Sequence, residues 1–266
     1  MTAASSQPLA GRRVVVTRTR EQASVLTDRL TRLGAEVLEL PVLRITGEIS
    51  KPELADCLLE LARYDWIVFT SGNGVHFFFE EFFRLFEDIR SLGFTRIAAV
   101  GDGTSRGLKA LHLKVECQPQ VATAEGLADA LIATGSLDNA QVLVITGNRN
   151  RETLVTKLEG EGRAIVDQLQ VYKTESTDLT DHPAAADYRA RGADVILFAS
   201  SSSAEFFQQQ AKALQLAPGA RRPLAGSIGP QTSAALKRCG IPVAFEAEQP
   251  GFDGLLAALV KQLGRP

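Results

Sequence analysis

The sequence has few of the residues that build disulfide frameworks or metal sites. Its 266 residues include three cysteines, Cys57, Cys117 and Cys239, which are far apart and form no C-x-x-C motif. An odd number of scattered cysteines argues against a disulfide framework and favours a reducing cytoplasm as the compartment. The three histidines are equally scattered and show no metal-ligand spacing. We therefore expect no metal site.

An excess of charge of one sign is also missing. The chain has 29 Lys and Arg against 31 Asp and Glu, a balance that argues against a nucleic-acid binder, because such proteins depend on surplus Lys and Arg. No segment approaches the roughly 18 uninterrupted apolar residues of a membrane span. The first residues, MTAASSQPLAGRR, lack the apolar run of a secretory signal. We expect a cytoplasmic protein that binds neither nucleic acid nor a membrane.

The sequence does contain an internal repeat with an offset of 128 residues. The segment IAAVGDGTSRGLK (97–109) matches AGSIGPQTSAALK (225–237), which aligns Gly101 with Gly229. A second pair with nearly the same offset is YDWIVFTSGNGVHFF (64–78) and ADVILFASSSSAEFF (193–207). Self-similarity at a fixed offset indicates two related halves.

Each half alternates short apolar runs with helical patterns. Six runs predict strands: Val14–Thr17, Trp66–Phe69, Ile97–Val100, Val142–Ile145, Val195–Phe198 and Leu224–Ile228. Near-continuous apolar runs are typical of strands buried on both faces of a parallel sheet. A helical pattern follows each run, so the alternation predicts two doubly wound α/β domains. The phenylalanine-rich segment 75–90 is expected to be one helix that packs against a sheet.

The six turns after these strands are rich in hydroxyl groups, glycine or arginine. In open α/β sheets, ligands bind beyond the carboxyl ends of the strands, where helix N-termini favour anions. Two turns also carry arginines, Arg18 with Arg20 and Arg149 with Arg151. For any single turn, helix capping is a sufficient explanation of Ser, Thr or Asn. Six similar turns favour an extended anionic ligand held by both domains.

Motifs for nucleotide binding and covalent catalysis are missing. The glycines of GDG (101–103) are followed by Gly107, so the dinucleotide pattern G-x-G-x-x-G is not met. No P-loop, G-x-S-x-G elbow or Cys/His nucleophile pair is present. We expect no organic cofactor, and general acid–base chemistry or pure positioning remains. Tyr172, in the alternating stretch 168–175 between the halves, is a candidate acid, with a packed linker tyrosine as the alternative.

Six segments follow one another along the chain: VVVTRTREQASVLTDRLTRLGAEVLELPVLRI, DWIVFTSGNGV, AAVGDGTSRGL, VLVITGNRNRETL, VYKT and SIGPQTSAAL. Their order and spacing resemble uroporphyrinogen-III synthase from about Arg12 to about Leu259. The resemblance implies two similar α/β domains joined by a two-strand ladder at about 38–45 and 168–175. One domain would be discontinuous, 1–42 plus 174–266, and the other would be 43–173.

The resemblance also implies a reaction. In this family the substrate is hydroxymethylbilane, a linear tetrapyrrole with eight carboxylates, and the product is uroporphyrinogen III. The terminal hydroxyl leaves as water, ring D attacks the resulting azafulvene, and a spiro intermediate recloses with ring D inverted. The task of such an enzyme is mostly to hold a reactive chain in one conformation.

The resemblance assigns roles to individual residues. Tyr172 matches the tyrosine proposed to help the hydroxyl leave as a general acid. The implied substrate-binding residues are Arg18, Ser71, Thr104, Arg151, Ser200, Ser202 and Thr232. The chain departs from the family pattern where proline is missing after Ser71 and after Ser200, where Gln231 replaces a threonine, and where Arg18-Thr19 replaces Arg-Pro. These departures concern individual contacts and leave the expected fold unchanged.

Two other functions stay open at this point. A non-catalytic tetrapyrrole-binding module could use the same scaffold, although retention of Tyr172 speaks against it. A two-domain glycosyl-transferring enzyme would need an acidic residue at a strand end to hold a ribose, which these turns do not show. We expect a monomer without cofactor whose partner is the linear tetrapyrrole, and leave open a transient contact with the preceding enzyme of the pathway.

Overall fold

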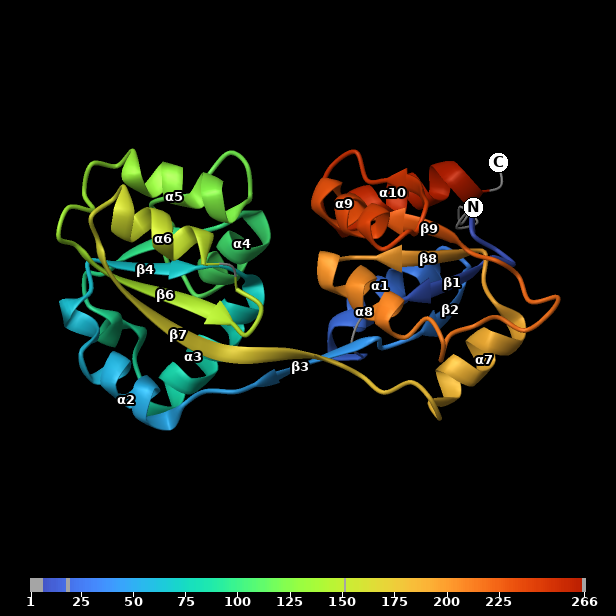
Figure 1. Ribbon diagram of the computed structural model, residues 1–266, viewed down its shortest axis with the longest axis horizontal. Helices are drawn as coiled ribbons and strands as arrows, with labels where there is room; N and C mark the ends of the chain where they lie inside the picture. The colour runs from blue at the N-terminus through green and yellow to red at the C-terminus, as the bar shows by residue number, and fades with distance from the viewer. Residues whose placement is uncertain (1–6, 18–19, 151, 265–266) are drawn as a thin grey trace, which may run out of the picture. The chain divides into compact units, whose positions relative to one another are not determined.

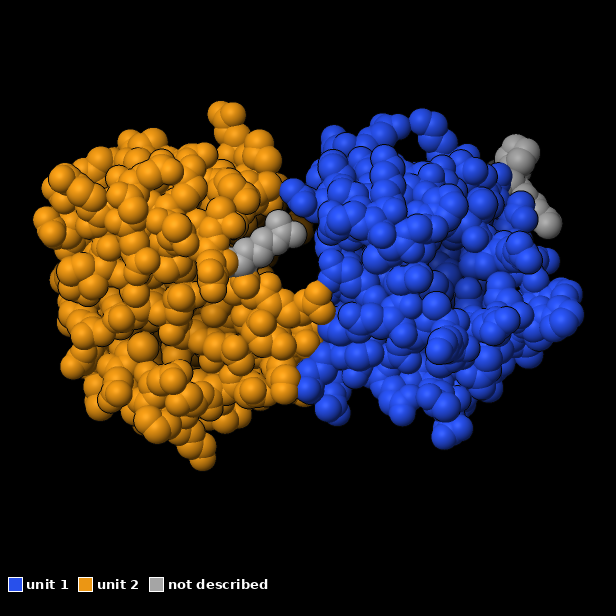
Figure 2. Space-filling view, viewed as in Figure 1, with its two compact units in different colours: residues 1–44, 175–266 blue, residues 45–174 orange. Residues whose placement is uncertain are grey.

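The computed structural model describes residues 7–17, 20–150 and 152–264 (Figure 1). The chain forms two compact units (Figure 2). Unit 1 comprises residues 1–44 and 175–266, and unit 2 comprises residues 45–174. The boundaries after residues 42 and 173 that the resemblance implies stay a prediction. In the described parts of the chain, no helix is long and apolar enough to cross a membrane.

Unit 2 is built on a five-stranded sheet in the order β3-β7-β6-β4-β5. Its elements are β3 (Leu43–Gly47), α2 (Lys51–Leu59), the 3₁₀ turn η1 (Leu61–Arg63), β4 (Trp66–Phe69), α3 (Gly72–Leu85), the 3₁₀ turn η2 (Ile89–Leu92), β5 (Arg96–Ala99), α4 (Asp102–Ala110), α5 (Ala124–Ile132), β6 (Gln141–Gly147), α6 (Thr153–Gly160) and β7 (Ile165–Ser176). β4, β5, β6 and β7 pair in parallel, so their carboxyl ends meet at one edge.

Unit 1 is built on a five-stranded sheet in the order β10-β9-β8-β1-β2, and all its strand pairs are parallel. Its elements are β1 (Arg13–Val16), α1 (Arg20–Arg32), β2 (Glu36–Glu39), α7 (Pro183–Arg191), β8 (Val195–Phe198), α8 (Ser201–Gln209), β9 (Leu224–Ser227), α9 (Pro230–Arg238), β10 (Val243–Glu246) and α10 (Phe252–Leu263). The order β2-β1-β8-β9 corresponds to β7-β6-β4-β5 of unit 2. The sequence repeat itself stays a prediction.

Strand residues in unit 2 alternate between two cores, one on each face of the sheet. Ile67 and Phe69 belong to a core shared with α2 and α3, whereas Trp66 and Val68 belong to a core shared with α5 and α6. Successive side chains of a strand point to opposite faces, so an uninterrupted apolar run fills both cores. Unit 1 uses the same arrangement: α1 and α10 pack on one face of its sheet, and Phe207 of α8 contacts Phe198 in β8. These layers give the doubly wound fold that the sequence predicts.

The chain passes between the two units twice, within β3 and within β7 (Figure 1). These strands are neighbours in the sheet of unit 2. The backbone N–H of Glu48 donates to Val171, and that of Thr177 donates to Val42, a register that runs in opposite directions along the two strands. β3 and β7 therefore form one antiparallel ladder. The resemblance implied linker strands at about 38–45 and 168–175, and the first of these bounds differs from the structure, in which β2 ends at Glu39 and β3 begins only at Leu43.

The expected single helix over 75–90 is wrong at both ends. α3 begins at Gly72, because Ser71 caps its N-terminus, and it ends at Leu85. Phe86 has an extended backbone, and the separate turn η2 begins after Asp88, whose carboxylate accepts a hydrogen bond from the N–H of Arg90. The phenylalanines therefore divide: Phe78, Phe79 and Phe82 are buried, as expected for helix-to-sheet packing, whereas Phe83 is exposed.

Candidate functional site

The described turns that the sequence predicts as ligand-binding lie at the carboxyl edge of each sheet. In unit 2, Ser71 follows β4, Gly101 follows β5 and Gly147 ends β6. In unit 1, Ser200 follows β8 and Gly229 follows β9. Most of these turns lead directly into a helix, whose first N–H groups have no partner within the helix and carry partial positive charge. Each edge is therefore suited to bind anionic groups.

Ser71 is the N-cap residue of α3. Its backbone is extended, and its Oγ accepts a hydrogen bond of 2.9 Å from the N–H of Gly74. Gly74 itself is buried, and a side chain there would contact Ile145 of β6. The start of α3 is therefore held close to the neighbouring strand, with its cap at the edge of the sheet.

Tyr172 lies on β7, two strands away from β4, yet its hydroxyl is 3.0 Å from the Oγ of Ser71. Burial raises the pKa of the Tyr172 phenol, and the hydrogen bond with Ser71 opposes that rise without cancelling it. The phenol is therefore protonated at neutral pH and can donate a hydrogen bond. The structure brings together two residues that the sequence predicts for the site and that are 101 positions apart.

The ring of Tyr172 is held between a glycine and a phenylalanine. A Cβ on Gly147 would lie 2.4 Å from the Cζ of Tyr172, so the ring rests directly on the Gly147 backbone. Phe77 of α3 stacks on the tyrosine, with ring centroids 6.0 Å apart and planes 21° apart. Both contacts restrict the tyrosine ring to one position.

Asn148 fixes the backbone on either side of Tyr172. Its N–H donates to the carbonyl of Tyr172, and its side-chain amide both accepts from the N–H of Thr174 at 2.8 Å and donates to the Thr174 carbonyl at 3.2 Å. The β6–β7 register shifts between Thr146 and Gly147, where the regular pairing ends. The Asn148 side chain continues the pairing past that irregularity, so Tyr172 sits on a fixed stretch of strand.

In the turn after β5, the backbone of Gly103 is exposed, whereas the predicted hydroxyl of Thr104 is buried. Thr104 lies inside α4 and is only 4% exposed. Gly103, in the first turn of the same helix, is exposed and has open space where a side chain would project. A Cβ on Gly72 would lie 4.0 Å from the Gly103 carbonyl, so the first turns of α3 and α4 are neighbours. Both helix N-termini therefore open on the same edge of unit 2.

In unit 1, Ser200 has the same position as Ser71. It is the N-cap of α8, and its Oγ accepts from the N–H of Ser203 and lies 3.1 Å from the Oγ of Ser202. The predicted pair Ser200 and Ser202 therefore forms one partly exposed hydroxyl cluster at this cap. Among the described residues no tyrosine hydroxyl bonds to this cap, and the tyrosine near α8, Tyr188 of α7, is buried with its ring against Phe207.

Thr232 is buried inside α9, as Thr104 is inside α4. The hydroxyl of Ser201 donates to the carbonyl of Gln231 at 3.1 Å, which ties the start of α8 to that of α9. At both turns, the predicted threonine is therefore a buried residue of the first helical turn, with its side chain packed inside the unit. Arg18 and Arg151, the predicted basic residues, lie outside the described residues.

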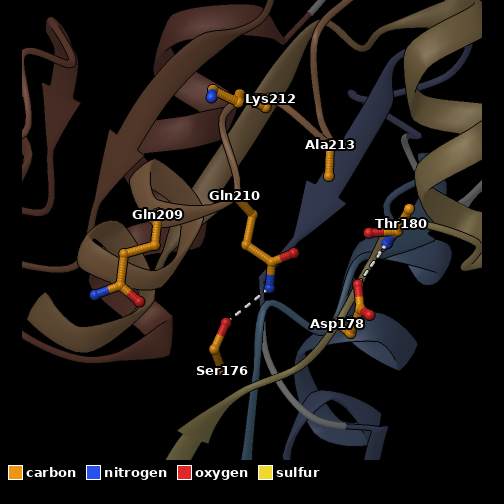
Figure 3. A pocket seen from close by; sticks show the side chains of 7 residues that line it. All are labelled: Ser176, Asp178, Thr180, Gln209, Gln210, Lys212 and Ala213. Carbon is orange, nitrogen blue, oxygen red and sulfur yellow. Dashed lines mark hydrogen bonds between the residues drawn. The ribbon is translucent and has the colours of Figure 1, made fainter.

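A hollow of about 590 Å³ in unit 1 lies where the end of β7 meets the end of α8, and no predicted site residue lines it (Figure 3). The Nε2 of Gln210 donates to Ser176 at 2.8 Å, and its Oε1 accepts from the N–H of Leu179 at 3.2 Å. The Asp178 carboxylate accepts from the N–H of Thr180. These polar groups already bond to one another, so the hollow marks the contact between the segment after β7 and the end of α8.

Sequence reasoning missed the residues that position Tyr172. Gly147 and Asn148 belong to a turn that the sequence singled out for its arginines, and Phe77 was assigned to core packing. A Gly-Asn pair directly after a buried strand was the available signal, because glycine permits close approach of a neighbouring group. Which ring approaches it depends on strand order, which a local pattern does not contain.

Comparison with known proteins shows relatives over most of the chain. The family model described as "Uroporphyrinogen-III synthase HemD" matches residues 24–257. The uroporphyrinogen-III synthase of Synechococcus elongatus is 30% identical over 265 residues, which cover 96% of this chain and 97% of that protein. The "Porphyrin biosynthesis protein HemD" of Ruminiclostridium josui is 26% identical over 96% of this chain, but the chain spans about half, 49%, of that protein's length.

A crystal structure of a mutant uroporphyrinogen III synthase from Thermus thermophilus matches with a TM-score of 0.62 and 21% identity, over 93% of this chain and 96% of that one. That likeness shows the shared fold.

Proposed function

Because the chain belongs to the uroporphyrinogen-III synthase family, we propose that it converts hydroxymethylbilane to uroporphyrinogen III. The reaction is a cyclisation that eliminates water and inverts ring D. The observation that supports this role in the molecule is the hydrogen-bonded pair of Tyr172 and Ser71 at an edge formed by helix N-termini. A phenol that can give a proton lies there beside groups that bind carboxylates.

Tyr172 acts on the leaving hydroxyl in this proposal. The phenol donates a hydrogen bond to the terminal hydroxyl, which leaves as water by taking up the proton that the adjacent pyrrole N–H loses, and the neutral azafulvene electrophile results. Ring D attacks, the spiro intermediate fragments, and reclosure followed by loss of a ring proton gives the macrocycle. The raised pKa of Tyr172 makes full proton transfer unfavourable at neutral pH, so its contribution is a hydrogen bond in the transition state with partial proton transfer.

The carboxylates of the substrate bind mainly to backbone N–H groups. α3 and α4 in unit 2, and α8 and α9 in unit 1, present their first turns at the carboxyl edges of the sheets. Ser71, Ser200 and Ser202 supply hydroxyls there. Binding through backbone dipoles needs no excess of basic side chains, which explains how a chain of net charge −2 binds an acidic ligand. Roles for Thr104, Thr232, Arg18 and Arg151 stay predictions, as do the sharing of one ligand by both units, the monomeric state and the cytoplasmic location.

The decisive experiment is an isomer assay. Purified protein is incubated with freshly generated hydroxymethylbilane, and the products are oxidised and separated into type I and type III porphyrins. We expect type III to dominate, against type I in the absence of protein, because unassisted closure does not invert ring D. A non-catalytic tetrapyrrole-binding module would bind the bilane but leave type I as the product, and that result would refute the proposal.

A further inference from the structure

The opposite edge of the unit 1 sheet carries a pocket lined by arginines. Arg13 begins β1, Glu36 begins β2, and Arg191 and Arg221 precede β8 and β9. Because these strands are parallel, all four residues lie at the amino edge, away from the caps of α8 and α9. The pocket has a volume of about 270 Å³ and is lined mostly by polar atoms. Nothing in the proposed cyclisation uses it.

Arg13 is the unusual member of this group. Its side chain is only 7% exposed, and its Nη2 forms an ion pair with Asp187. Its Nη1 and Nε have no hydrogen-bond partner among the described residues, although an oxygen of Glu36 lies 3.5 Å from Nε. Buried polar groups in native proteins are nearly always hydrogen-bonded, and an exception calls for an explanation, of which a bound water or ion is one. A guanidinium with unused donors is also the group best suited to oxyanions.

Two further arginines are held beside Arg13 by the backbone. The N–H of Arg221 donates to the carbonyl of Arg191, and the N–H of Ala193 donates to the carbonyl of Arg221. Gly192 lies between them with φ +65°, and a Cβ there would be 1.9 Å from the Arg221 carbonyl, so only glycine allows this approach. The backbones of Arg191 and Arg221 are therefore fixed relative to each other before any ligand arrives.

The charges around the pocket show what a ligand would replace. Glu36 pairs with Arg191 at 2.9 Å and faces Arg13, while Asp187 also contacts both arginines. Asp194 is occupied by Arg221 at 2.6 Å, with Arg12 at 3.7 Å. Of the three carboxylates, Glu36 alone is half exposed while lining the pocket. It is the carboxylate that can swing into solvent and give its place to another anion.

We infer that this pocket binds a small oxyanion, a phosphate or carboxylate group, in exchange for the side chain of Glu36. The anion would take the donors of Arg13 and Arg191 that face Glu36, with Arg221 completing the site. The inference is independent of the proposed cyclisation, because it concerns the other edge of the sheet and needs no bilane.

The test measures binding of inorganic phosphate and of malonate to the full chain by calorimetry and by thermal denaturation, against sodium chloride of equal ionic strength. We expect both anions, or one of them, to bind the wild type and raise its melting temperature beyond the chloride control; which one binds identifies the ligand as a phosphate or a carboxylate. Arg191→Gln and Arg221→Gln should each weaken binding by about tenfold or more, because each loses a charge-assisted hydrogen bond. Arg32→Gln, an exposed arginine elsewhere in unit 1, is the matched control and should bind normally.

Glu36→Gln separates this site from a general attraction of anions. Removing the competing carboxylate should tighten binding several-fold, in the opposite direction from the arginine variants. Two results would overturn the inference. The first is no effect of either anion beyond chloride in the wild type and in Glu36→Gln. The second is binding that persists unchanged in Arg191→Gln and Arg221→Gln, which would place the anion elsewhere, for example at the helix N-termini of the other edge.

Discussion

Gly147 and Tyr172 form a close pair across strands β6 and β7, in which the tyrosine ring occupies the space of the side chain that glycine lacks. A Cβ at position 147 would be 2.4 Å from the Cζ of Tyr172, far inside van der Waals contact. The pair lies where the register of the two strands shifts. The absence of a side chain at one position therefore determines where the phenol of the other can lie.

Gly147→Ala should move the Tyr172 ring away from Ser71. Overpacking of this kind costs about 1–3 kcal/mol of stability, and the displaced phenol should lower turnover at least as much as its removal does. Gly160→Ala is the control, because a Cβ there meets nothing within 4 Å. In a Tyr172→Ala background the cost of Gly147→Ala should largely disappear, since the clash is gone. Equal stability losses in both backgrounds would contradict the contact.

Tyr172→Phe removes the phenol hydroxyl and leaves the ring contacts with Gly147 and Phe77. Removal of a general acid typically costs about 10²–10⁴-fold, and we expect the low end or less, because the hydroxyl of the bilane leaves readily even in water. Type III should remain the main enzymatic product, since isomer choice follows from the bound conformation. Turnover and melting temperature are measured on the same preparation. Normal turnover in a stable variant would remove Tyr172 from the mechanism.

Ser71→Ala should affect both stability and turnover, because Ser71 caps α3 and binds the Tyr172 hydroxyl. Loss of an N-cap costs about 0.5–2 kcal/mol. Thr123→Ala provides the matched control: Thr123 caps α5 through the N–H of Gly126 at 2.9 Å, and the structure gives it no contact with Tyr172 or Ser71 among the described residues. We expect similar losses of unfolding free energy and a loss of turnover in Ser71→Ala only. Equal turnover in the two variants would show that Ser71 acts only as a cap.

All three tyrosines should titrate late on the alkaline side. Burial raises the pKa of Tyr188 to about 12, and it also raises the pKa values of Tyr64 and Tyr172 above the ordinary value of 10.0. The folded state then holds these protons more tightly than the unfolded chain. The resulting stability is complete below about pH 10 and is lost as the pH rises through the folded pKa values.

Denaturant unfolding measured across alkaline pH, together with tyrosinate absorbance, checks this expectation. The free energy of unfolding should fall between about pH 10 and 12, and Tyr188→Phe should reduce that slope because it removes one of the three groups. Tyrosinate absorbance that develops fully near the ordinary value while the protein stays folded would contradict the burial of these phenols.

The local sequence determined the architecture of this protein. Apolar runs such as Val195–Phe198, each followed by a polar turn and a helical pattern, predict buried parallel strands with helices on both faces, and the structure has that arrangement. This information is local, because burial on both faces makes a strand continuously apolar. Helix ends were less predictable. Phe86 continues the apolar pattern of α3 but has an extended backbone, because contacts with neighbouring elements decide where the chain leaves a helix.

Only the tertiary structure decided how the site is assembled. The sequence suggested Tyr172 and Ser71 separately, but their hydrogen bond depends on β7, β6 and β4 being neighbours in that order and on the register shift at Gly147. It also could not show that Thr104 and Thr232 are buried beneath the helix starts they were expected to serve. Capping patterns and periodicity describe residues a few positions apart. A contact between residues 101 positions apart is fixed by the packing of the whole sheet.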